Sequence, residues 1–89
     1  MTAKSYVEIE KLEAQTNLLV HQLAHYKLVL RQILQQYNVD NPSGIEEKIK
    51  IGKIDEHPAY EDYLDALSYQ MEIEDLWQEI QTQLSHFKE

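Results

Sequence analysis

The stretch IEKLEAQTNLLVHQLAHYKLVLRQILQQY, residues 9–37, has apolar side chains at alternating intervals of three and four residues. This spacing is a heptad pattern, in which positions a and d form the contact seam of a helix. Position a falls on Ile9, Thr16, Leu23, Leu30 and Tyr37, and position d on Leu12, Leu19, Tyr26 and Ile33. Because no Gly or Pro interrupts residues 3–37, we predict one long helix over about residues 3–38.

The apolar stripe of this helix is wider than a two-stranded coiled coil requires. Val20 and Leu34 fall at position e and Val29 at position g, where charged side chains are usual. A wide stripe suits a bundle in which the helix has more than one neighbour. We therefore expect an oligomer interface formed by Leu12, Leu19, Val20, Leu23, Tyr26, Val29, Leu30, Ile33 and Leu34.

The segment NVDNPSG, residues 38–44, ends the first helix. Asn38 suits a left-handed helix cap, and Pro and Gly follow it. Ser43 and Glu46 have the spacing of a capping box. We predict a short helix over about residues 44–52, closed by Gly52, inside a connection that spans about residues 39–57.

A second long helix is predicted over about residues 58–87, with Pro58 in its first turn. Its apolar residues form two clusters roughly 140° apart at 100° per residue. One contains Tyr60, Tyr63, Leu64, Leu67 and Met71, and the other contains Tyr69, Ile73, Leu76, Ile80, Leu84 and Phe87. We expect two neighbours for this helix: the first helix on one cluster, and the connection or a second chain on the other.

These elements predict an all-α single domain, residues 1–89: a long antiparallel helical hairpin with a short connecting helix. The chain has 89 residues and no cysteine, so disulfides and thiolate zinc sites are excluded. A domain this small buries only roughly 60% of the surface that its unfolded chain exposes, so its stability is marginal. We therefore expect it to associate, with a homodimeric four-helix bundle as the favoured arrangement and a higher oligomer as the alternative.

The negative charge is concentrated in the C-terminal third. The net charge is −8, and residues 55–89 hold ten Asp and Glu against one Lys. Such a surface repels phosphate backbones, so the sequence disfavours direct nucleic-acid binding and favours a basic protein partner. No apolar run approaches the ~20 residues that span a bilayer, and residues 1–15 lack the apolar core of a signal peptide. We expect no membrane association and a cytoplasmic protein.

The strongest candidates for a metal or catalytic site are His21 and His25, which stand one helical turn apart. They fall at heptad positions f and c, away from the seam, and residue 22 is Gln where a zinc protease helix has Glu. No Asp or Glu precedes a histidine by three residues, as a di-iron bundle requires. For His57 we expect a capping or turn role and not a catalytic one. We predict no catalytic residue, no metal and no cofactor, and therefore no enzyme.

Aromatic and apolar residues of the second helix are the best candidates for partner binding, because Tyr and Trp combine large area with a polar tip. These candidates are Tyr60, Tyr63, Leu67, Met71 and Trp77. The expected function is that of an adaptor, assembly factor or regulatory subunit that presents an acidic helical surface to a protein partner. Two alternatives stay open: a metal-binding or enzymatic bundle, and an acidic DNA mimic that inhibits a DNA-binding protein.

Overall fold

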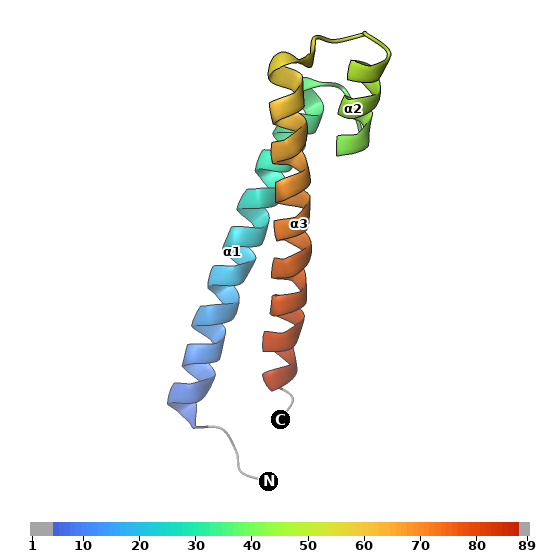
Figure 1. Cartoon of the computed structure of the whole chain (residues 1–89). Helices are drawn as coiled ribbons and strands as arrows, with labels where there is room; N and C mark the ends of the chain where they lie inside the picture. Colours follow the sequence, from blue (N-terminus) through green and yellow to red (C-terminus); the bar gives the residue numbers. More distant parts are fainter. Residues whose placement is uncertain (1–4, 88–89) are drawn as a thin grey trace.

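The structure, a computed structural model, describes residues 5–87 as three helices and no strand. They are α1 (Tyr6–Gln36), α2 (Pro42–Lys50) and α3 (Glu56–His86). Helices α1 and α3 run antiparallel and pack against each other, separating toward the start of α1 and the end of α3, and α2 packs beside the first part of α3 (Figure 1). The molecule measures 62 × 17 × 16 Å. The predicted all-α hairpin with a short connecting helix is confirmed.

The ends of α1 follow from local hydrogen bonds. The Ser5 side chain accepts a hydrogen bond from the Glu8 amide and caps the helix start. The predicted residues 3 and 4 lie outside the described residues. At the other end Asn38 has a positive φ of 55°, and the Val39 amide donates to the Leu34 carbonyl. The left-handed stop predicted at Asn38 is confirmed.

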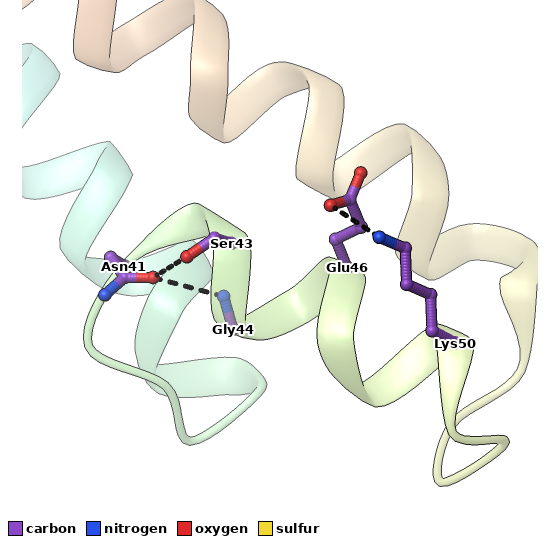
Figure 2. Close-up of polar contacts among 5 residues, drawn as sticks. All are labelled: Asn41, Ser43, Gly44, Glu46 and Lys50. Atoms are coloured by element: carbon purple, nitrogen blue, oxygen red, sulfur yellow. Dashed lines mark hydrogen bonds and ion pairs between the residues drawn. The ribbon is translucent and has the colours of Figure 1, made fainter.

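Helix α2 begins two residues before the predicted start, and its predicted cap was wrong. Asn41, not Ser43, is the N-cap, and its side-chain oxygen accepts from the Gly44 amide at 3.1 Å (Figure 2). Ser43 donates to that same oxygen, and Glu46 pairs with Lys50 at 3.4 Å instead of reaching back. Pro42 explains the shift. Its ring suits the first helical position, so the N-cap is the residue directly before it, Asn41. Gly52, at φ 74°, closes the turn after α2 as predicted.

Helix α3 matches the predicted second long helix. His57 has extended backbone, φ −110° and ψ 131°, and its peptide bond to Pro58 is cis. Proline disfavours helical dihedrals in the preceding residue, so the uninterrupted helical backbone runs from Pro58, where the sequence predicts its start.

The heptad seam of α1 faces α3. All nine a and d residues are buried or half-buried. The central cluster consists of Leu23 from α1 with Leu76 and Ile80 from α3, and Leu19, Tyr26 and Ile73 pack against it. The expected contact between the first helix and the second apolar cluster of α3 is confirmed for Ile73, Leu76 and Ile80.

A second buried region lies at the α2 end. Ile45 of α2 and Ala66 of α3 are fully buried, and Ala59 is 2% exposed. The Tyr37 hydroxyl donates to the Asp62 carboxylate, and the Lys48 ammonium donates to the Tyr37 carbonyl at 2.7 Å. Burial and the hydrogen bond to Asp62 raise the pKa of Tyr37 to about 12. These contacts connect the end of α1 to both other helices.

Candidate functional site

One side of the hairpin carries an open groove between α1 and α3. Two hollows of about 440 and 450 Å³ share the lining residues Lys27, Gln70 and Ile73, so they lie next to each other, and we treat them as one groove. Leu23 and Trp77 line one end, and Val39 and Asp40, which lead into α2, line the other. The groove is defined by Leu23, Lys27, Leu30, Arg31, Leu34, Gln35, Val39, Asp40, Gln70, Ile73, Glu74 and Trp77.

A further hollow lies at the end of the hairpin away from α2. It is lined by Glu13, Thr16 and Asn17 of α1 and by Leu84 and Phe87. Leu84 is 47% exposed and Phe87 38%. These two members of the predicted second cluster of α3 are therefore only partly covered by α1. Two helices alone cover this end of the hairpin incompletely.

The predicted oligomer interface divides into two sets. Its seam residues are occupied within the chain, because they pack between α1 and α3; these are Leu12, Leu19, Leu23, Tyr26, Leu30 and Ile33. Val20 is 46% exposed, and Val29 and Leu34 are half-buried. The flanking positions, and not the seam, are therefore the part of this predicted interface that α3 leaves most accessible.

The predicted partner-binding residues lie on two faces of α3. Trp77 is 51% exposed and lines the groove. Tyr60 and Met71, 42% and 67% exposed, lie with Leu64 away from it. Tyr63 and Leu67 are half-buried. A hydrogen bond to Glu46 of α2 raises the pKa of Tyr63, so the structure brings this tyrosine against α2.

Four exposed carboxylates, which we call the acidic face, follow one side of α3: Asp65, Glu72, Asp75 and Glu79. Their spacings of seven, three and four residues place them on one face of a helix. Glu72 stands two residues from Gln70 and from Glu74, which is 200° around the helix at 100° per residue. The acidic face therefore points away from the groove.

Within residues 5–87, no cationic side chain forms an ion pair with the acidic face. Among residues 5–87, the ion pairs join Lys50 to Glu46 and His57 to Glu61, and none involves a carboxylate of the acidic face. The hydrogen bond to Glu61 raises the pKa of His57. The predicted role of His57 at the turn agrees with this contact across the start of α3.

The candidate metal residues do not come together. His21 and His25 are exposed on α1, and nowhere in residues 5–87 do three His, Asp or Glu side chains form a group able to hold a metal ion. No helix in the described part of the chain is long and apolar enough to cross a membrane.

Sequence reasoning missed the polar residues of the groove. Lys27 and Gln70 line both of its hollows but were not predicted, because the interface was selected from apolar side chains. Lys27 occupies heptad position e, next to the seam. That position could have indicated from the sequence that its side chain borders the contact between the two long helices.

No curated protein and no solved structure matches the chain. One family model matches residues 2–86, nearly the full length. The chain that folds into this three-helix hairpin therefore belongs to the Uncharacterized protein MJ0235 family.

Proposed function

We propose that this chain is an interaction protein, an adaptor or regulatory subunit, that binds a basic surface of a protein partner through the acidic face of α3. The observation that supports this most is the absence of any ion-pair partner for Asp65, Glu72, Asp75 and Glu79 within residues 5–87.

The charges of the acidic face repel one another. Glu72 and Asp75 are three residues apart, and Asp75 and Glu79 four, so each pair shares one face of the helix. Like charges at this spacing destabilise an isolated helix by ~0.2–0.5 kcal/mol per pair. A partner that supplies Lys or Arg removes this repulsion. The same field accelerates the encounter with a basic protein.

Apolar side chains adjoin the acidic face and complete a surface of mixed character. Tyr60, Leu64 and Met71 each stand one residue before an acidic residue of α3 and are 42%, 45% and 67% exposed. Tyr and Met are enriched where proteins bind one another. The partner surface that fits is therefore apolar beside its basic residues.

The test compares affinity purification of the full chain with that of two variants of equal charge change. The triple variant Glu72→Gln/Asp75→Asn/Glu79→Gln neutralises three of the four carboxylates of the acidic face. The control Glu8→Gln/Glu10→Gln/Glu47→Gln removes three exposed carboxylates outside α3 and outside the groove. We expect a basic protein to be recovered with the wild-type chain and with the control, to be lost with the triple variant, and to elute as salt rises.

Recovery of the same proteins with all three chains would refute the proposal, since the acidic face would then be irrelevant to binding. A recovered DNA-binding protein that duplex DNA displaces would identify the acidic face as a mimic of phosphates, which is a special case of the same function. Circular dichroism of both variants checks that the helices remain.

A further inference from the structure

A second regular row of residues lies on α1 beside the seam. Its members recur at intervals of four and three, and all six are exposed: Glu13, Asn17, Val20, Ala24, Lys27 and Arg31. Lys27 and Arg31 line the groove, and Glu13 and Asn17 line the hollow next to Leu84 and Phe87. This outer row therefore follows the open side of the hairpin over about 27 Å.

The outer row is symmetric about residue 22 in position and complementary in charge. Val20 and Ala24 are equally distant from that point, as are Glu13 and Arg31. If a second α1 lies antiparallel against the first with its centre at residue 22, each Glu13 lies opposite the partner's Arg31. Small Val20 and Ala24 meet at the centre, where they allow the two helices to approach closely. A parallel pair would instead place Glu13 against Glu13 and Arg31 against Arg31.

Trp77 of α3 stands at the same level as the centre of the outer row. It lines one hollow together with Leu23 and Lys27 of α1 and is 51% exposed. It is the single tryptophan of the chain. In the antiparallel arrangement it lies near the two-fold axis and is covered by the second chain.

The position of α2 also favours the antiparallel arrangement. Val39 and Asp40, which lead into α2, close one end of the groove, and α2 stands at that end of the hairpin (Figure 1). Two parallel hairpins would bring both α2 helices to the same end of the interface. Antiparallel hairpins place them at opposite ends, where each leaves the centre of the groove open.

We propose that the groove and the outer row form a self-association surface, occupied by a second copy of this chain in antiparallel orientation about an axis near residue 22. This inference is independent of the proposed function, because the acidic face points away from the groove. The resulting four-helix bundle covers Val20, Trp77 and Leu84 and presents one acidic face on each outer side.

Light scattering after gel filtration measures the mass of the full chain over about a hundredfold range of concentration. We expect a dimer that dissociates on dilution, with a red shift of the Trp77 emission as the side chain becomes exposed. Glu13→Arg creates two like-charge pairs per dimer and raises the dissociation constant about tenfold. Adding Arg31→Glu to the same chain restores the opposite charges and the affinity. A folded monomer at every concentration, or a double variant no better than the single one, overturns the proposal.

Cysteine cross-linking tests the orientation directly, because the chain has no cysteine of its own. Positions 13 and 31 are too far apart on one helix for an internal disulfide, which requires Cα atoms within about 7 Å. The variant Glu13→Cys/Arg31→Cys is expected to form a covalent dimer on mild oxidation, whereas Glu13→Cys alone is not. Efficient cross-linking of the single variant would indicate a parallel dimer and refute the antiparallel one.

Discussion

The two ends of the hairpin differ in how completely their apolar side chains are covered. At the α2 end three helices meet, and Ile45, Ala59 and Ala66 are at most 2% exposed. At the end that holds the start of α1 and the end of α3, only two helices pack, and Leu84 and Phe87 stay 47% and 38% exposed. The comparison indicates that a third helix completes the core at one end, whereas two helices leave the other end partly open.

Polar groups follow the same division. Near α2, Tyr37 is bonded to Asp62, and its carbonyl accepts from Lys48. Toward the other end, the buried Thr16 Oγ1 and Gln83 Oε1 have no hydrogen-bond partner among the described residues. Buried polar atoms without partners cost stability. We therefore expect the α2 end to be the more stable half of the molecule.

The largest effect is expected at Ile45, which has no exposed surface. Ile45→Ala leaves a cavity among three helices and lowers the free energy of unfolding by about 2–5 kcal/mol. The half-buried Leu12 provides the comparison at the other end, where Leu12→Ala should cost clearly less. Urea denaturation of both variants measures the difference, and equal losses would contradict the contrast between the two ends.

Gly44 is expected to be intolerant of the smallest side chain. A Cβ added there would lie 2.8 Å from Val39 Cβ and 2.9 Å from its Cγ1. Gly44→Ala therefore lowers the free energy of unfolding by about 1–3 kcal/mol through overpacking, although Ala favours a helix over Gly by about 1 kcal/mol. Thermal melting provides the measurement, and Val39→Ala in the same chain, which removes Cγ1 but keeps Cβ, should recover only part of the loss. A stabilised Gly44→Ala would show that this end is packed loosely.

Tyr37→Phe removes the hydrogen bond to Asp62 and is expected to cost about 0.5–1.5 kcal/mol at neutral pH. The pKa of Tyr37 is raised from 10.0 to about 12 in the folded chain. Between these values the unfolded chain loses this proton and the folded chain keeps it, so its contribution to stability falls as pH rises. Denaturation of both proteins from pH 8 to 11 should show a steeper alkaline loss in the wild type. Parallel curves would argue against the contact.

The smallest predicted effect is a gain in the free energy of unfolding. Thr16→Val removes a buried hydroxyl without a partner and keeps the shape of the side chain, so it should stabilise the chain by up to about 1 kcal/mol. Thr82 is the matched control, because its hydroxyl is exposed and donates to the Gln78 carbonyl at 3.1 Å; Thr82→Val should not stabilise. A loss in melting temperature with Thr16→Val would mean that its hydroxyl is satisfied in solution.

Predictions from the sequence were most accurate where one residue acts locally. Asn38 and Gly52 have the positive φ values expected of helix stops, and α3 becomes regular at Pro58. The cap of α2 was wrong because two local signals compete within four residues. Asn41 and Ser43 are both good caps, and the proline between them decides in favour of Asn41.

The sequence by itself determined the three helices, the seam of α1 and the acidity of α3, because periodicity, capping and charge are properties of neighbouring residues. Only the tertiary structure decided that Ala59 and Ala66 are core while Met71 and Trp77 stay exposed. Alanine is common on helix surfaces as well as in cores, so its burial depends on which helix lies over it. The position of α2 against α3 made that choice, and it also left one side of the hairpin open as the groove.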